Sequence, residues 1–236
     1  MEQREFQGIS FYLIRKRGMR NLRLKVNSKG SVVVSAPYWV RITDINNFVL
    51  RCESKIKKAE KNIPKHTYLT GDSILLLGRN RFLEVIELPQ KNKTMAQYCI
   101  EDGKIAVYVG NKDVEIVKNA IKQMYINTVA EVLASRVPYW VNVAQIGNVP
   151  SFGVNKAKTK WGVCYTRERR LYLSYMCAIL PYELIDMVVL HEVCHLKIEG
   201  HGPAFWALMR NYMPDLDKRR AQLKEFSKQW FTYNLV

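Results

Sequence analysis

The sequence predicts an α+β protein with two parts, a β-rich unit over residues 1–110 and a domain of mixed helices and strands over residues 111–236. In the first part, short runs alternate apolar and polar residues between glycine and asparagine turns, which is typical of strands. From Asn111 the apolar residues recur every three or four positions, which is the period of an amphipathic helix. A chain of 236 residues can bury one large core or two smaller ones.

The N-terminal unit is expected to contain strands and one helix. Strands are predicted over residues 11–16, 22–26 and 31–36, followed by two pairs over 73–78 with 81–87 and 96–100 with 104–109. Gly78-Arg79-Asn80 and Asp102-Gly103 supply the turns within these pairs. The helix is predicted from about Asp44 to Lys61, and Thr43 can cap its first turn.

The second part is expected to begin with a long helix that ends near Arg136. Three strands are then predicted over residues 151–156, 160–165 and 171–175. Prolines at positions 181, 203 and 214 mark the starts of three further helices, because proline is tolerated in the first turn of a helix.

Composition favours a cytoplasmic protein. The first ten residues, MEQREFQGIS, lack the apolar segment of a secretory signal. No long apolar run adjoins the motif described below, so a membrane partner is not expected. The five cysteines are scattered and contain no C-x-x-C pair, which favours reduced thiols over disulfides or a cysteine-based zinc site.

The chain is strongly basic, with a formal net charge of +16. Residues 1–110 hold 20 basic and 10 acidic residues, a net charge of +10, and residues 111–236 hold 17 and 11, a net charge of +6. A positive field attracts polyanions and acidic substrates, but it also serves solubility. Nucleic acid and nucleotides therefore stay open as partners beside a peptide or protein substrate.

One stretch, VVLHEVCHLKIEGHGPAFW over residues 188–206, contains three of the four histidines of the chain. His191 and His195 are four residues apart, so on an α-helix they project from one face within reach of a single cation. Imidazole nitrogens suit Zn²⁺, although another divalent transition metal would also fit. Glu192 lies about 100° round the helix from His191, where it can accept a proton from water without binding the metal.

A third ligand, His201, depends on how the helix ends. On an unbroken helix this residue would lie about 120° away from the face of the other two. Gly200 can adopt the left-handed conformation that ends a helix, and the turn would then bring His201 back. The pattern predicts one metal ion per chain, held by three histidines with one position open for water, which is typical of catalytic zinc.

The residues around the motif indicate that its helix is buried. Apolar side chains surround most of the helix: Ile185, Met187, Val188, Val189, Leu190, Val193 and Leu196. Two histidines and a carboxylate in such a helix are unfavourable unless they are hydrogen-bonded or bind a cation, which favours the metal site. Cys194 is interpreted as a small buried residue, and the isolated His66 as a surface residue.

With a metal at this site, the predicted reaction is hydrolysis. The cation would acidify water, Glu192 would accept the proton, and hydroxide would attack a carbonyl or phosphoryl centre. The negative charge that develops in the reaction needs a further donor. Lys160, Tyr165 and Tyr172 are candidates because they belong to segments near the site, although either tyrosine could equally pack against the sheet.

Three segments carry a resemblance to a known family: TKWGVCYTRERRLYLS (159–174), LPYELIDMVVLHEVCHLKIEGHGPAFW (180–206) and MPD (213–215). Together they resemble the YgjP-like metal-dependent hydrolases, which are related to SprT-like and other zincin metallopeptidases. The resemblance is specific over about residues 156–215 and weaker in the N-terminal unit, where YLTGDSILLLGR is similar. It implies a zincin-like hydrolase domain over residues 111–236.

The resemblance also implies roles for individual residues. It makes His191, His195 and His201 metal ligands, makes Glu192 the catalytic base, and places the strand around Trp161 beside the cleft. An extended peptide would add main-chain hydrogen bonds to that strand. Substrate contacts are expected from Lys160, Trp161, Gly162, Tyr165 and Tyr172. Four positions depart from the family pattern without removing a ligand or the base: Val163, Ser174, Gly200 and Gly202.

Three functions are compatible with these features. The leading hypothesis is a zinc metallopeptidase with a three-histidine site and a glutamate base. The second is a metal-dependent nucleotide pyrophosphatase, which the basic residues favour and the lack of a P-loop disfavours. The third is a nucleic-acid-binding protein with a structural zinc, in which Tyr38 and Trp39 would stack on bases. A peptidase recruited to nucleic acid by its N-terminal unit combines the first and third.

Overall fold

The structure of the chain is a computed structural model that describes residues 2–26, 31–61, 66–89, 96–101, 103–157 and 159–229. Contacts group the chain into two compact units, one over residues 1–65 and the other over residues 66–236. Each unit contains both helices and small sheets, so the predicted α+β class is confirmed. Among the described residues, no helix is both long and apolar enough to cross a membrane.

The division between the two units differs from the predicted boundary near residue 110. Residues 73–109 belong to the same unit as the histidine-bearing helix, because one hydrophobic core from Tyr68 to Leu216 joins them. A separate core, from Phe11 to Ile56, fills the first unit. Local sequence patterns show which residues are buried but not which core they enter. The assignment of residues 111–236 as a zincin-like hydrolase domain stays a prediction.

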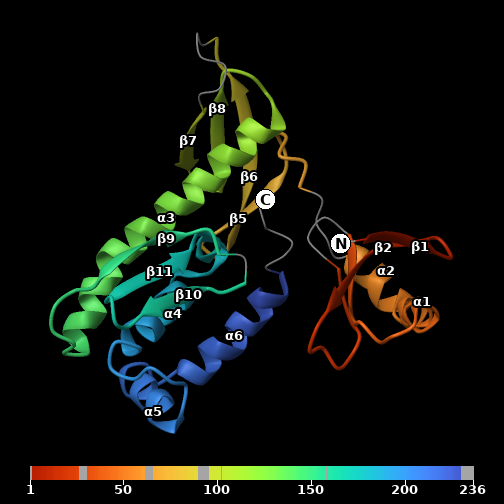
Figure 1. Cartoon of the computed structure of the whole chain (residues 1–236). Coiled ribbons are helices and arrows are strands. Elements are labelled where there is room, and N and C mark those ends of the chain that lie inside the picture. The colour runs from red at the N-terminus through yellow and green to blue at the C-terminus, as the bar shows by residue number, and fades with distance from the viewer. Residues whose placement is uncertain are drawn as a thin grey trace. The chain divides into compact units, whose positions relative to one another are not determined.

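The first unit is a four-stranded sheet with two helices (Figure 1). Its strands are β1 (Glu2–Phe6), β2 (Ile9–Lys16), β3 (Arg23–Val26) and β4 (Val32–Pro37), in the order β1-β2-β4-β3. The sequence predicts no strand at β1, because four of its five residues are polar. Gln7 and Gly8 both take positive φ angles, 47° and 78°, and fold β1 back onto β2 as an antiparallel hairpin.

The single helix predicted for the first unit is two helices, α1 (Ile42–Arg51) and α2 (Glu53–Lys61), which meet at Cys52. Arg41 occupies the N-cap position of α1 without a side-chain hydrogen bond, so the predicted Thr43 cap is wrong. The buried side chains of the two helices, Ile45, Val49 and Ile56, lie in the core of this unit.

The second unit begins with a sheet of strands β5 (Ser73–Leu76), β6 (Arg79–Glu87), β7 (Ala96–Glu101) and β8 (Lys104–Val109), in the order β5-β6-β8-β7. Leu77 and Gly78 form the turn between β5 and β6, and their N–H groups donate to the carbonyl oxygens of Ala178 and Ile179. A Cβ atom on Gly78 would lie 2.6 Å from Cγ of Pro181. This turn therefore requires glycine and docks directly on the segment that leads into the histidine-bearing helix.

The histidine-bearing part of the second unit combines a three-stranded sheet with helices. Its elements are β9 (Ser151–Asn155), β10 (Gly162–Tyr165), β11 (Arg170–Ser174), the 3₁₀ helix η1 (Tyr175–Ile179), α4 (Tyr182–Cys194), α5 (Pro203–Tyr212) and α6 (Leu216–Gln229). The strand order is β10-β11-β9, so β10 lies at an edge, antiparallel to β11. Helix α4 packs against β10, β11, α5 and α6.

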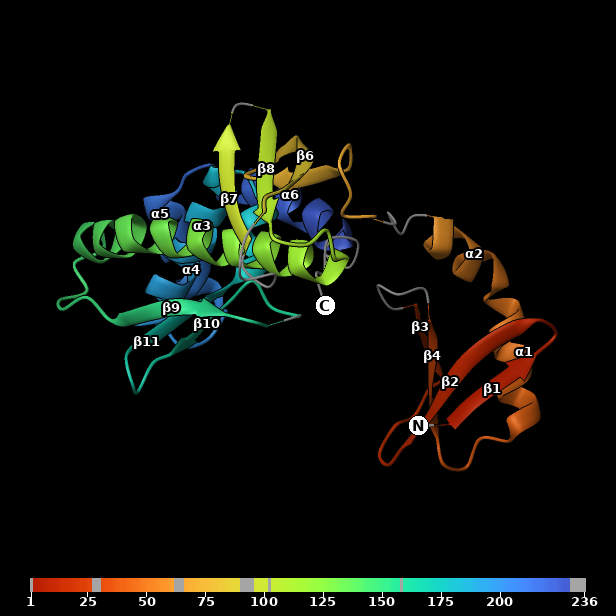
Figure 2. The same ribbon diagram turned by 90° about the horizontal axis from the view of Figure 1, so that it is seen from above.

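A 30-residue helix, α3 (Val114–Val143), runs past both sheets of the second unit (Figures 1 and 2). It contacts β7 and β8 of one sheet, β9 of the other, and helix α4. The predicted end at Arg136 is wrong, because the helix continues through Pro138. The residues after Arg136 that pack into the core hold these last turns in place: Val137, Trp140 and Val141.

A largely buried ion pair joins α3 to α4. Arg136 donates from Nε to Oδ1 of Asp186 at 2.6 Å and from Nη2 to Oδ2 at 3.0 Å, and Trp140 donates from Nε1 to Oδ1 at 2.7 Å. Replacing Asp186 with alanine leaves both donors without their carboxylate. We expect the free energy of unfolding, measured by urea denaturation, to fall by about 3 kcal/mol.

The matched control for this prediction is Asp217→Ala. The carboxylate of Asp217 pairs with Arg210 at 2.9 Å, but its side chain is 63% exposed. An exposed pair of this kind contributes little to stability, so the control should unfold nearly like the wild type. Equal losses of stability in the two variants would contradict a specific role for the pair between α3 and α4.

Candidate active site

Three histidine nitrogens converge in the second unit. The Nε2 atoms of His191 and His195 are 3.2 Å apart, those of His195 and His201 are 3.2 Å apart, and those of His201 and His191 are 3.0 Å apart. These three side chains form a cluster that could hold a metal ion. His195 is buried, His191 is half-buried and His201 is exposed, so the cluster can be reached from solvent.

The backbone brings His201 to the other two histidines by a route that differs from the prediction. Helix α4 already ends at Cys194, and His195 is its C-cap in the right-handed conformation. Hydrogen bonds within residues 193–198 then form a tight turn. Gly200 does not take a left-handed φ angle, so its predicted role as the helix-ending glycine is wrong. The turn before it redirects the chain without glycine.

Neighbouring groups hold the histidine rings in place. Nδ1 of His195 lies 3.0 Å from the carbonyl oxygen of Ile198, which fits a proton on Nδ1 and leaves the lone pair of Nε2 facing the cluster. Phe205 stacks on His195 with ring centroids 4.5 Å apart and packs against the other two rings. Trp206 packs beside the same cluster, and the guanidinium of Arg220 lies 3.8 Å from its ring centroid. Helices α5 and α6 thus support the site.

Burial keeps two of the histidines neutral. Burial, together with repulsion from the charged forms of His195 and His201 and from Arg220, lowers the pKa of His191 from 6.5 to about 3. Burial also lowers the pKa of His195, although its hydrogen bond to the carbonyl of Ile198 acts in the opposite direction. Both imidazoles are therefore uncharged at neutral pH, which is the form that binds a cation.

The donor set fits a divalent transition metal. A tetrahedral zinc ion about 2.0–2.1 Å from each nitrogen would hold the three nitrogens about 3.3–3.4 Å apart. The observed separations of 3.0–3.2 Å are close to this. Imidazole donors suit zinc better than Mg²⁺ or Ca²⁺, which prefer oxygen. Cys194 is fully buried, as predicted, and burial raises the pKa of its thiol to about 12, so it stays protonated.

Glu192 is buried beside the histidines and faces the edge strand β10. A Cβ atom on Gly162 of that strand would lie 2.5 Å from Oε1 of Glu192, so the carboxylate occupies the space that any other side chain would need. Burial raises the pKa of Glu192 to about 8, while the positive charge of Lys160 lowers it. A dication among the histidines would also favour the ionised carboxylate. The carboxyl group thus lies beside the cluster that could hold a metal ion.

A pocket of about 550 Å³ opens over this cluster. Residues of β10, of the turn after it and of the histidine cluster line the pocket together with Glu192. The outer edge of β10 pairs with no further strand in the part of the chain that the structure describes. Backbone groups of an unpaired edge strand can bind an extended chain.

The pocket contains three of the five predicted substrate-contact residues: Lys160, Gly162 and Tyr165. Trp161 and Tyr172 lie elsewhere. Trp161 packs against the core, and its Nε1 donates to Oγ of Ser227 in α6 at 3.1 Å. Tyr172 packs edge-on against Tyr165, with ring centroids 6.2 Å apart. These two aromatic residues support the strand that borders the pocket.

The pocket also contains residues that the sequence does not single out. Oγ1 of Thr166, in the turn after β10, donates to Oε1 of Glu199 at 2.9 Å. This bond joins the turn to the loop that carries His201. Arg167 and Glu168 line the pocket from the same turn. The two loops are more than 30 residues apart in the sequence, so no local spacing signals their contact.

Ser174 is a departure from the family pattern that has a structural explanation. Its hydroxyl donates to the carbonyl oxygen of Ala157 and accepts from the N–H of Met176, and its own N–H donates to the carbonyl oxygen of Trp161. Ser174 therefore fixes the segment that leads into β10.

The fourth histidine lies outside the cluster. Nδ1 of His66 is 3.3 Å from Oδ1 of Asp72, and the side chain of His66 is only 9% exposed. The interpretation of His66 as a surface residue is therefore wrong. Its position is nevertheless separate from the pocket residues, so it offers a control histidine for experiments on the cluster.

A family model described as "YgjP-like, metallopeptidase domain" matches residues 20–226 of the chain. The matched range contains the three histidines, Glu192 and the whole of β10, and it extends well beyond the segments over 156–215 that carry the specific resemblance. No curated protein matches the chain.

Proposed function

Because the chain belongs to the YgjP-like family, whose model describes a metallopeptidase domain, we propose that it is a zinc-dependent peptidase. The metal ligands are His191, His195 and His201, and Glu192 is the general base. The observation that carries this proposal is the convergence of three Nε2 atoms beside a buried carboxylate. Zinc is favoured by the all-imidazole donor set, although another divalent transition metal would also fit.

In the proposed peptide hydrolysis, the groups around the metal position have separate roles. A divalent cation there supplies a Lewis acid that polarises a carbonyl group and acidifies water. Glu192 takes the proton from the attacking water and passes it to the leaving amine. Its buried position strengthens it as a base. Lys160 lines the same pocket, and its positive charge would stabilise the negative charge that develops on the carbonyl oxygen.

Strand β10 is proposed to bind the peptide. Its outer edge leaves backbone N–H and C=O groups for an extended chain, and its Gly162 lets the carboxylate of Glu192 lie against the strand. Tyr165 is 50% exposed at the end of the strand and offers a surface for a substrate side chain. A peptide in this position would lie along β10, in the pocket that the three histidines also line.

The proposed function can be tested with metal-loaded protein on two substrate classes, unfolded casein and nucleoside triphosphates. We expect cleavage of casein, loss of cleavage with a chelator, and recovery when zinc is added back. Hydrolysis of nucleotides without cleavage of casein would favour the pyrophosphatase alternative and contradict the proposal. Stoichiometric zinc without hydrolysis of either substrate would instead favour a structural zinc.

Gly162→Ala provides a test of the contact between β10 and Glu192. The added methyl group would collide with the carboxylate of Glu192, because its Cβ would lie 2.5 Å from Oε1. A displaced base loses its alignment, so we expect kcat for peptide hydrolysis to fall by about 10²-fold. Metal content, measured by elemental analysis, should not change.

Gly202→Ala is the matched control for this substitution. A Cβ atom on Gly202 meets no other atom within 4 Å, and the residue takes no left-handed φ angle. This variant should keep wild-type kcat. If Gly162→Ala kept wild-type kcat as well, the close packing of β10 on Glu192 would have no role in the reaction.

A cytoplasmic location is part of the proposal. All five cysteines have free thiols, which suits a reducing compartment.

A further inference from the structure

The N-terminal unit carries most of the excess positive charge of the chain. Residues 1–65 contain 15 lysines and arginines against 5 aspartates and glutamates, a net charge of +10. The longer second unit contains 22 basic and 16 acidic residues, a net charge of +6. The histidine cluster and the pocket beside β10 both consist of residues of the second unit.

The topology gathers basic and aromatic residues at one end of the first sheet. Strands β2 and β4 are parallel, and Lys16 at the end of β2 is in register with Pro37 at the end of β4. The segment after β2 therefore emerges next to Tyr38 and Trp39. Strand β3 runs back antiparallel to β4, which places Arg23 in register with Ser35 near the same end.

The guanidinium of Arg15 holds the turn that carries the two aromatic residues. Its Nη1 lies 2.9 Å from the carbonyl oxygen of Pro37, 3.0 Å from that of Tyr38 and 2.9 Å from that of Val40. The side chains of this turn remain free: Tyr38 is 62% exposed and Trp39 is 74% exposed. Two large aromatic rings are thus displayed on a backbone that is already ordered, which reduces the entropy lost on binding.

Two hollows meet at the loop over residues 16–20. One, of about 670 Å³, lies between this loop and the Tyr38–Trp39 turn, and the other, of about 470 Å³, lies between the loop and Arg23. We call this surface the basic groove, defined by Lys16, Arg17, Arg20, Arg23, Tyr38 and Trp39. No acidic residue lines either hollow. Within the described residues, the four basic side chains form no salt bridge with a carboxylate.

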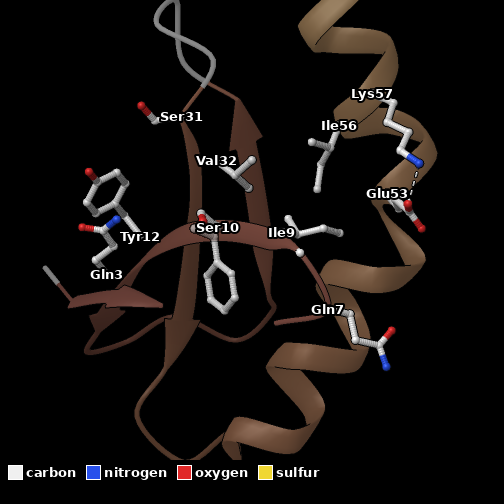
Figure 3. Close-up of a pocket in the computed structure, with 12 residues that line it drawn as sticks. Gln3, Gln7, Ile9, Ser10, Tyr12, Ser31, Val32, Glu53, Ile56 and Lys57 are labelled. Carbon is white, nitrogen blue, oxygen red and sulfur yellow. Dashed lines mark ion pairs between the residues drawn. The ribbon is translucent and has the colours of Figure 1, made fainter. Parts of the chain in front are cut away.

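A third hollow of the same unit has no unpaired basic side chain among its described lining residues. It lies between the sheet and helix α2, and Figure 3 shows Ile9, Val32 and Ile56 beside polar residues. Its lysine, Lys57, pairs with Glu53 at 2.7 Å, so this charge is neutralised locally. At the basic groove, exposed aromatic rings lie beside positive charges that form no salt bridge with any described carboxylate.

We propose that the basic groove binds single-stranded nucleic acid. The arginine and lysine side chains would contact phosphates, and Trp39 and Tyr38 would stack on bases, which single strands leave exposed. A duplex would offer phosphates but no free base faces. A membrane-binding surface would present a broad apolar face, whereas the described part of the first unit exposes two large hydrophobic residues, Tyr38 and Trp39. This binding is separate from the peptidase proposal and would bring nucleic-acid-bound proteins to the enzyme.

The test measures binding of the full chain to a fluorescent single-stranded oligonucleotide of about 20 nucleotides by anisotropy. If four cations contact phosphates, affinity should fall about 50-fold between about 50 and 200 mM salt. Trp39→Ala should weaken binding by about 5- to 150-fold through the loss of stacking, and Trp39→Phe should recover most of it. A duplex of the same length should show no dependence on Trp39.

A pair of double variants separates the basic groove from charge in general. Arg17→Ala/Arg20→Ala removes two charges from the groove, and Lys55→Ala/Lys58→Ala removes two exposed charges from α2. The first variant should reduce the salt dependence by about half, and the second should leave it unchanged. Both should keep wild-type thermal melting and wild-type hydrolysis of a short peptide.

Three results would overturn the proposal. The first is no binding of the oligonucleotide at low salt. The second is equal weakening by the two double variants, which would indicate diffuse charge attraction. The third is tight binding to phosphatidylglycerol vesicles through Trp39 without binding to the oligonucleotide, which would assign the groove to membranes. None of these results depends on whether the chain hydrolyses peptides, so the two proposals can fail independently.

Discussion

Replacing Glu192 with glutamine is expected to lower kcat for peptide hydrolysis by about 10²–10⁴-fold, the usual contribution of a general base. Glutamine has nearly the shape of glutamate and can fill the same space against Gly162, but it cannot accept the proton of water. Metal content should stay at the wild-type level, because the three imidazole nitrogens converge without Glu192. Elemental analysis and initial rates on casein together measure both expectations.

Glu183→Gln is the matched control for this variant. Glu183 lies in the first turn of the same helix and is exposed, so the same chemical change is made away from the pocket. It should leave both kcat and metal content unchanged. A Glu192→Gln protein with an unchanged rate would remove Glu192 as the base, and one that lost its metal would point instead to a role in metal binding.

Replacing His201 with alanine is expected to remove the metal and, with it, the hydrolytic activity. Only two imidazoles would remain, and zinc sites in proteins use at least three protein ligands. Added zinc should raise the melting temperature of the wild type, since a ligand that binds only the folded state stabilises it, and it should not raise that of the variant. Thermal melting therefore reports on the site without any activity assay.

His66→Ala provides the control for the loss of a histidine. His66 pairs with Asp72 and lies outside the cluster, so this variant should keep its metal and its response to zinc. If His201→Ala retained one equivalent of metal, the third ligand would have to be another group, and the proposed three-histidine site would be wrong.

Much of the fold follows from local patterns in the sequence. The helices α4, α5 and α6 begin within two residues of the prolines that predict them, because proline suits the first turn of a helix. Strands β5 to β8 lie where the alternating runs predict them. Strand β1 escapes prediction because its pairing depends on the Gln7–Gly8 turn rather than on apolar alternation. Helix α3 continues beyond its predicted end at Arg136. Burial of Trp140 and its neighbours stabilises these last turns more than Pro138 destabilises them.

The sequence likewise predicts one part of the candidate site and not the other. The spacing of His191 and His195 predicts a shared helical face, and their Nε2 atoms are 3.2 Å apart. His201 joins them as predicted, but through a turn before Gly200 rather than through a left-handed glycine. The turn hydrogen bonds form between backbone groups, which every sequence possesses, so residue identity carries little information about them.

By itself, the sequence determined the family, the α+β class and the grouping of two histidines and a glutamate at the end of one helix, because these follow from motif spacing and short-range periodicity. Only the tertiary structure decided that Gly162 packs on Glu192, that Trp161 supports β10 from behind the pocket, and that residues 66–109 share a core with the site. The physical reason is the same in each case. These contacts join segments that lie far apart in the chain, and their geometry depends on how whole sheets and helices pack.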